Sequence, residues 1–164
     1  MTTTSTEFVA DSPAATEAFA ARWAQTLAPD TVILLHGGLG AGKTTFVRGL
    51  ARGLGIAGPV RSPTFTLIHE YTIQQPPRLQ GLPFFHVDLY RLETAAQLHT
   101  LGLEEALERG GIIAIEWAER LEQGGVRLPV SHLYEVRLTA AGDSLRRIRI
   151  APLQKSPAAA DSTP

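Results

Sequence analysis

Apolar residues occur in short runs along the chain, and these runs predict β-strands. Thr31–His36 (T-V-I-L-L-H) and Ile112–Ile115 (I-I-A-I) are almost wholly apolar. That pattern is typical of parallel strands covered on both faces. Phe84–Tyr90 (F-F-H-V-D-L-Y) predicts a third strand, and Glu7–Ala10 predicts a short strand at the edge of a sheet.

Helical spacing follows two of these strands. Ser12 before Pro13 predicts a helix start that continues to about Ala28, because serine caps helix N-termini and proline fits their first turn. Its expected buried stripe is Phe19, Trp23 and Leu27, so Trp23 is interpreted as a core residue rather than a binding residue. A second helix is predicted over Phe46–Leu54, with Phe46, Leu50 and Leu54 on one face.

The middle of the chain predicts a hairpin with an unusual connection. Alternation over Phe65, Leu67, His69, Tyr71 and Ile73 predicts a strand with these side chains on one face, antiparallel to Phe84–Tyr90. His69 is therefore interpreted as an ordinary strand residue rather than a catalytic one. The connection Gln74–Pro83 is longer than most hairpin loops.

The rest of the chain completes an alternating α/β pattern. Short helices are predicted at Thr94–Thr100, Glu104–Arg109 and Ala118–Gln123, and two closing strands at His132–Thr139 and Leu145–Ile150. Residues 7–150 are expected to form a single domain, with residues 1–6 and the Pro/Ala/Ser-rich residues 151–164 disordered. The expected fold class is α/β: three layers, with a mixed central sheet flanked by helices.

Composition narrows the possible functions. The 164 residues include no cysteine, which excludes disulfides, cysteine-ligated metals and thiol chemistry. The formal net charge of −1 gives no basic footprint for gripping nucleic acid directly. No signal peptide and no apolar run of membrane-spanning length is visible, so a cytoplasmic protein without membrane contact is expected.

The clearest motif is Gly37-Gly38-Leu39-Gly40-Ala41-Gly42-Lys43-Thr44, which matches G-x-x-x-x-G-K-[ST], the Walker A pattern. It lies between a predicted strand and a predicted helix, as a P-loop requires. The residues expected to bind the nucleotide are Gly38, Leu39, Gly40, Ala41, Gly42, Lys43, Thr44 and Thr45. Lys43 should reach the outer phosphates, and the Thr44 hydroxyl should bind Mg²⁺. The chain has only one other lysine, Lys155.

A P-loop also needs an acidic group near the metal, usually at the end of a neighbouring strand. Glu116 follows Ile112–Ile115, and Asp88 follows the apolar run that starts at Phe84. Each could instead be a surface carboxylate, paired with Arg120 or with Arg91. Trp117 either covers the site or packs in the core.

Two further residues lie between the Walker helix and the next strand. Thr64 occupies a Ser-Pro-Thr segment where other P-loop proteins place a γ-phosphate-sensing switch; the alternative is a turn-capping hydroxyl. Arg61 is a weaker candidate for an internal arginine finger.

Several P-loop classes are excluded by missing motifs. The chain contains no asparagine, so the guanine-reading N-K-x-D motif is absent. There is no L-S-G-G-Q transporter signature, and a compact hairpin occupies the region where a small-molecule kinase would have its lid.

Five stretches together resemble the TsaE (YjeE) family, the ATPase of bacterial tRNA threonylcarbamoyladenosine biosynthesis. They are G-G-L-G-A-G-K-T-T-F-V-R-G-L, S-P-T-F-T-L-I-H-E-Y, H-V-D-L-Y-R-L, L-G-L-E-E-A-L and I-I-A-I-E-W-A-E-R. The resemblance covers about residues 7–150. It departs at the Gln74–Pro83 insertion and at Ala118, where the family often has proline.

The resemblance implies ATP and Mg²⁺ as ligands, and assembly with the two other proteins of the threonylcarbamoyl-transfer complex, with tRNA contacted only indirectly. It implies weak Mg-dependent ATPase activity that partners stimulate and that drives the cycle of the complex. It also implies phosphate and metal binding by Lys43 and Thr44, a switch role for Thr64, essential acids at Asp88 and Glu116, and Trp117 beside the site. Glu116 is assigned to the metal shell. The alternative is a small-metabolite or nucleoside kinase.

Overall fold

The computed structural model describes residues 4–63, 66–126 and 128–153. Its strands are β1 (Thr6–Ala10), β2 (Thr31–His36), β3 (Ile68–Thr72), β4 (Pro83–Asp88), β5 (Ile112–Glu116), β6 (His132–Ala140) and β7 (Arg146–Pro152). Its helices are α1 (Pro13–Ala24), α2 (Lys43–Gly53), α3 (Ala95–Thr100), α4 (Leu103–Glu108) and α5 (Arg120–Gln123).

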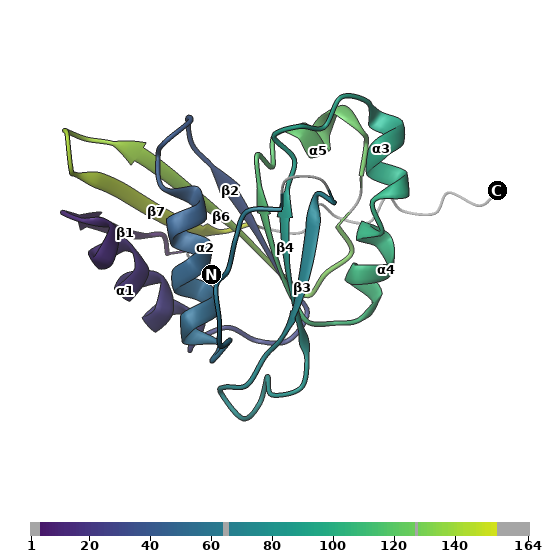
Figure 1. The fold of residues 1–164 in the computed structure, drawn as a ribbon, viewed down its shortest axis with the longest axis horizontal. Helices are drawn as coiled ribbons and strands as arrows, with labels where there is room; N and C mark the ends of the chain where they lie inside the picture. Colours follow the sequence, from purple (N-terminus) through teal and green to yellow (C-terminus); the bar gives the residue numbers. More distant parts are fainter. Residues whose placement is uncertain (1–3, 64–65, 127, 154–164) are drawn as a thin grey trace.

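The strands form one mixed seven-stranded sheet in the order β1-β7-β6-β2-β5-β4-β3. The central strands β6, β2, β5 and β4 are parallel, whereas β3, β7 and β1 pair antiparallel with their neighbours. The carboxyl ends of β2, β5 and β4 therefore meet at one edge of the sheet, at the top of Figure 1.

Helices cover both faces of this sheet, so the expected three-layer α/β architecture is confirmed. Figure 1 shows α1 and α2 on one face and α3, α4 and α5 on the other. Each face buries its own apolar core, and side chains alternate between the two cores along a strand: Phe84 lies in the first core and Phe85 in the second.

Close contact between α1 and α2 corrects the predicted stripe of α1. Its buried positions are Thr16, Ala20 and Ala24, of which Ala20 faces Gly49 and Ala24 faces Gly53 of α2. A Cβ atom added at Gly49 would lie 2.5 Å from the Glu17 carbonyl oxygen, so only small residues fit where the helices touch.

The larger residues of the predicted stripe flank that contact. Phe19 stacks on Phe8, and Trp23 packs edge-on against Tyr134, both partly buried beside the core. Trp23 is thus a packing residue, as expected. The helix ends at Ala24 rather than near Ala28.

Backbone conformation explains the shorter β3. Leu67 has a left-handed φ of 60°, which interrupts the expected alternation, and its side chain joins Ile68 against the second core. Phe65 lies outside the described residues. His69 and Tyr71 remain on the other face, and the antiparallel pairing of β3 with β4 is confirmed.

Other boundaries move by a few residues. Helix α2 begins at Lys43, within the glycine-rich motif. Helix α5 begins at Arg120 rather than Ala118, after Trp117 in a left-handed conformation with φ of 58°. The sheet extends past both expected domain limits, because Thr6 belongs to β1 and Pro152 to β7.

The connection between β3 and β4 packs at the end of the molecule opposite the glycine-rich loop (Figure 1). Leu79 is buried in the first core, and the Gln74 amide donates to the Leu54 carbonyl at the end of α2. In the described part of the chain, no helix is long and apolar enough to cross a membrane.

Candidate functional site

The loop between β2 and α2 is shaped by glycines in conformations that other residues avoid. Gly40 and Gly42 have φ values of 76° and 102°. Gly42 is the N-cap of α2 and offers no side chain to cap it. The free N–H groups at the start of α2, which include those of Lys43 and Thr44, therefore suit an anion.

Lys43 is folded back onto this loop. Its Nζ donates to the carbonyl oxygens of Gly37 at 2.5 Å and Gly38 at 2.9 Å, and lies 3.9 Å from the centre of the Trp117 ring. Only 5% of Lys43 is exposed, so its side chain is buried beneath the loop and the indole ring. Trp117 covers Lys43 while also packing against the second core, so it combines the two alternatives.

Burial lowers the pKa of Lys43 below its usual value of 10.5, because the charged form loses water. The carboxylates of Glu116, Glu119 and Asp88 oppose that shift. The ammonium group is thus held in a site that hydrates it poorly, beside acidic residues and two carbonyls.

Glu116 connects the loop helix to the sheet. The Thr44 hydroxyl lies 2.9 Å from its Oε1 and 3.1 Å from its Oε2, and His86 Nε2 lies 2.6 Å from Oε2. Glu116 is 2% exposed and His86 is fully buried. A buried carboxylate with donors from α2 and β4 is fixed in position.

Asp88 lies directly beside Glu116, since the two residues pair in register across β4 and β5. Its Oδ2 accepts a hydrogen bond of 2.6 Å from the Ser62 hydroxyl, and its Oδ1 accepts from the Tyr90 amide at 3.0 Å. Asp88 is therefore tied to the segment that precedes β3. Thr64, in that segment, lies outside the described residues.

The arginines suggested as alternative partners are engaged elsewhere or unpaired. Arg120 donates to the Leu92 carbonyl at 2.9 Å rather than to Glu116. Among the described residues, no ion pair joins Asp88 to Arg91, and Arg61 is exposed.

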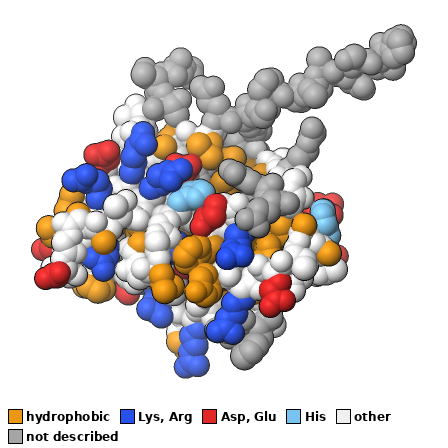
Figure 2. All heavy atoms as spheres, turned by 90° about the horizontal axis from the view of Figure 1, so that it is seen from above, with side chains coloured by type: hydrophobic (Ala, Val, Ile, Leu, Met, Phe, Trp, Pro, Cys, Tyr) orange, Lys and Arg blue, Asp and Glu red, His pale blue; other side chains and the backbone are white. Residues whose placement is uncertain are grey.

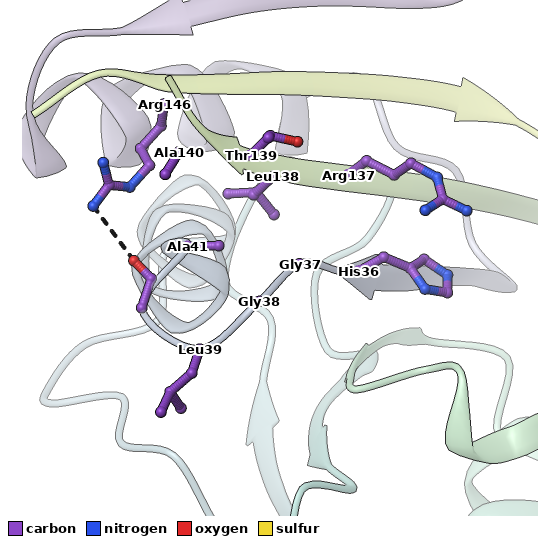
Figure 3. A pocket seen from close by; sticks show the side chains of 11 residues that line it. His36, Gly37, Gly38, Leu39, Ala41, Arg137, Leu138, Thr139, Ala140 and Arg146 are labelled. Atoms are coloured by element: carbon purple, nitrogen blue, oxygen red, sulfur yellow. Dashed lines mark hydrogen bonds between the residues drawn. The ribbon is translucent and has the colours of Figure 1, made fainter. Parts of the chain in front are cut away.

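A groove of about 410 Å³ runs between the glycine-rich loop and the β6–β7 hairpin. Figure 3 shows Arg146 reaching toward the loop, where its guanidinium lies 3.4 Å from the Gly40 carbonyl oxygen, whereas Leu39 points away. His36 and Arg137 lie at the other end. Viewed from this end of the molecule, charged side chains of both signs lie among apolar ones (Figure 2).

Comparison with known proteins identifies the family. Residues 10–148 match the family model described as "Threonylcarbamoyl adenosine biosynthesis protein TsaE". The chain belongs to the TsaE family. A TsaE protein from Nostoc sp. is 46% identical over 132 residues, which cover 78% of this chain and 74% of the relative. One from Bacillus subtilis is 42% identical over 137 residues, covering 83% and 78%.

A solved structure agrees with this TsaE assignment. The crystal structure of Bacillus subtilis YdiB superposes with a TM-score of 0.72 at 32% identity, covering 94% of this chain and 89% of that one. The family resemblance read from the five sequence stretches is therefore confirmed.

The sequence interpretation of this TsaE chain missed His86. Part of the signal was present, because His86 and Asp88 are two positions apart on one strand and so face the same side of the sheet. That Glu116 faces this side too depends on the register between β4 and β5. His69, the histidine that was considered, lies on β3 with its ring 6.4 Å from that of Tyr71, centroid to centroid.

The oxygen atoms at this TsaE site suit Mg²⁺ with few protein ligands. Thr44 and Glu116 place a hydroxyl and a carboxylate at the start of α2. Among the described residues, no group of three or more His, Cys, Asp or Glu residues could hold a metal alone. Mg²⁺ commonly keeps several waters and binds through one or two protein oxygens plus phosphates, so these residues fit that ion.

Lys43 gives a testable pH dependence. Because its pKa is lower in the folded state, the unfolded chain binds more protons at this residue between the folded-state pKa and 10.5. Its contribution to the free energy of unfolding must therefore increase as the pH rises through that window. We therefore expect the free energy of unfolding of wild type to rise relative to that of Lys43→Met as the pH increases from 7. Urea unfolding at a series of pH values measures this difference.

Lys155→Met removes the same charge at the only other lysine and serves as the control. A difference that falls with pH at Lys43 would show that the folded site favours the charged form.

Proposed function

We propose that this chain is the ATP-binding and ATP-hydrolysing component of the machinery that makes tRNA N6-threonylcarbamoyladenosine, and that it acts in the cytoplasm. Family membership supports the pathway. The observation that carries the enzymatic part is the contact of Thr44, at the start of α2, with the buried Glu116 at the end of β5. That contact joins a phosphate-binding loop to an acidic residue, as nucleotide hydrolysis requires.

The loop would hold the phosphates of ATP. Backbone N–H groups of the loop and of the start of α2 would surround the anion, and Lys43 would exchange its carbonyl partners for the outer phosphate oxygens. Phosphate oxygens are better partners than carbonyls for an ammonium group, because charge-assisted hydrogen bonds are stronger. Lys43 therefore has a reason to leave its present position when ATP binds.

Thr44 and Glu116 would hold Mg²⁺, which neutralises charge that develops on the phosphates during transfer. The Thr44 hydroxyl can donate a hydrogen bond to Glu116 and still offer an oxygen lone pair to the metal. Glu116 acts in or just behind the metal shell. Asp88 is assigned to a different task, orientation of the attacking water or of the switch segment, because its donor is Ser62 in that segment.

The groove beside the β6–β7 hairpin is proposed to hold the nucleoside. β5, which carries Glu116, and β6 lie on opposite sides of β2. The outer phosphates are proposed to lie on the β5 side, near Glu116. A nucleotide whose outer phosphates are near Glu116 would extend along the loop toward Arg146. The planar guanidinium of Arg146 is suited to stacking on a base.

Hydrolysis by the isolated chain is proposed to be slow. An arginine finger contributes about 10³–10⁵-fold to phosphoryl transfer, and Arg61, the internal candidate, is exposed and forms no hydrogen bond or ion pair with the described residues of the site. The missing charge is proposed to come from the two partner proteins of the transfer complex, with Thr64 as a switch residue. A small-metabolite kinase remains the second candidate.

Nucleotide binding should stabilise the fold selectively. ADP with Mg²⁺ at about 100 times its Kd should add about 2.7 kcal/mol, or roughly 5–11 °C in melting temperature for a chain of this size. GDP should give a much smaller shift, because the chain lacks the guanine-reading motif. Thermal unfolding with each nucleotide measures this, and a larger shift with GDP would refute the adenine assignment.

The fate of the γ-phosphate separates the two functions. With γ-labelled ATP, we expect label to appear as free phosphate, slowly with the pure protein and faster when both partner proteins are added. Lys43→Ala should abolish release, because the outer phosphates lose their cation. Label transferred to a metabolite or nucleoside from a cell extract would favour the kinase.

Substitution of Glu116 and of Asp88 should produce different defects. Glu116→Gln should weaken the Mg²⁺ dependence of ADP binding, because a charge leaves the metal shell. Asp88→Asn should leave ADP binding with Mg²⁺ nearly intact yet stop partner-stimulated turnover. Calorimetric titration and phosphate release measure the two effects. The reverse pattern would exchange the roles, and normal turnover in both variants would show that neither residue takes part in hydrolysis.

A further inference from the structure

We propose that His86 is a positioning residue: its Nε2–H holds the Glu116 carboxylate in the orientation that accepts the Thr44 hydroxyl, and so sets how strongly Mg²⁺ enhances nucleotide binding. The inference rests on the proposed function, because it concerns the same metal site. It assigns a third residue to that site, from a strand that contributes no residue to the glycine-rich loop.

The register of the sheet brings His86 to Glu116. His86 on β4 lies opposite Ala114 on β5, and Asp88 lies opposite Glu116. The Ala114 side chain is a single methyl group, so it leaves room for the imidazole to reach the next residue on that face, Glu116. The resulting Nε2–Oε2 distance is 2.6 Å, and both side chains are almost wholly buried.

The hydrogen bond fixes which nitrogen of the imidazole is the donor. A carboxylate can only accept, so Nε2 carries the proton that lies between the two groups. The other nitrogen, Nδ1, is buried and has no hydrogen-bond partner among the described residues. A buried polar atom without a partner costs free energy.

That cost argues against a purely structural role. The neighbours of His86 on β4, Phe85 and Val87, are apolar and buried, and an apolar side chain at position 86 would avoid the unpaired nitrogen. What histidine adds at this position is one donor to Glu116. Partners of this kind orient metal-binding side chains and commonly contribute about 10–100-fold to metal affinity.

In the described part of the chain, Glu116 has two side-chain donors, and they come from different layers of the molecule. Thr44 belongs to α2, which carries the loop, and His86 belongs to the sheet. Without the His86 donor, the carboxylate keeps only the threonine and can turn with it. The sheet would then fix only the backbone of Glu116, and no longer the direction of its carboxylate oxygens relative to the phosphates.

The test compares three variants by titrating each with ADP, with and without Mg²⁺. His86→Leu removes the donor, whereas the side-chain amide of His86→Gln can replace it near the Nε2 position. The control is His69→Leu: His69 pairs with His86 across β3 and β4 but does not contact Glu116. Melting temperatures of the unliganded proteins report any general loss of stability.

We expect His86→Leu to reduce the factor by which Mg²⁺ increases ADP affinity about 10–100-fold. The ADP affinity in the absence of Mg²⁺ should be unchanged. His86→Gln should regain most of the enhancement, and His69→Leu should behave as wild type. An unchanged enhancement in His86→Leu overturns the proposal, as does a His86→Gln variant as defective as His86→Leu. If His86→Leu does not fold, His86→Gln and His69→Leu decide it, because equal losses in both overturn the specific role. A wild-type protein without any Mg²⁺ enhancement would instead overturn the metal site of the proposed function.

Discussion

The candidate site depends on one buried carboxylate, that of Glu116. A carboxylate removed from water must be matched by donors, because its hydration is lost on burial. The fold supplies them from two directions, a hydroxyl from the start of α2 and an imidazole from β4. Both arrive because β2, β5 and β4 are parallel and end at the same edge of the sheet. The glycine-rich loop follows β2 at that edge, so the geometry of the loop and the position of the acid are set by the same strands.

The site also holds the buried ammonium group of Lys43, and the loss of hydration on burial costs free energy. Lys43 is enclosed by loop carbonyls and the Trp117 ring, and burial lowers its pKa although three carboxylates act against the shift. Carbonyl dipoles and an aromatic face stabilise an ammonium group less well than a phosphate does. An anion entering the loop would therefore gain from a charge that the carbonyls and the indole ring solvate poorly. Trp117 reaches this position through a left-handed backbone conformation directly after Glu116, so the chain leaves β5 in the way that the contact with Lys43 requires.

Much of this arrangement follows from local sequence, and the exceptions have physical reasons. Apolar runs locate β2, β4 and β5 because those strands are buried on both faces, and the glycine-rich motif has one characteristic structure. The stripe of α1 was predicted only in part: Leu27 is buried and Phe19 and Trp23 pack beside the core. Helical spacing does not reveal that α2 would approach so closely, which only the glycines at 49 and 53 permit. His86 was missed because its role depends on the register between β4 and β5, which neither strand encodes alone. The burial of Lys43 was missed for a similar reason, since Trp117 comes from a different part of the chain.

The two acids of the site differ in the residues that hold them in place. Asp88 and Glu116 are paired residues on neighbouring parallel strands, so the register alone gives no reason to treat them differently. Their donors do. Glu116 is held by residues of a helix and of the central sheet, which are rigid elements. Asp88 is half-buried and is held by Ser62, in the connection that leads to β3. A connection can change conformation without breaking the sheet, whereas β4 cannot move without disrupting its pairing with β5. Glu116 is therefore suited to a task that must be ready before the nucleotide arrives, and Asp88 to one that depends on where the connecting segment lies.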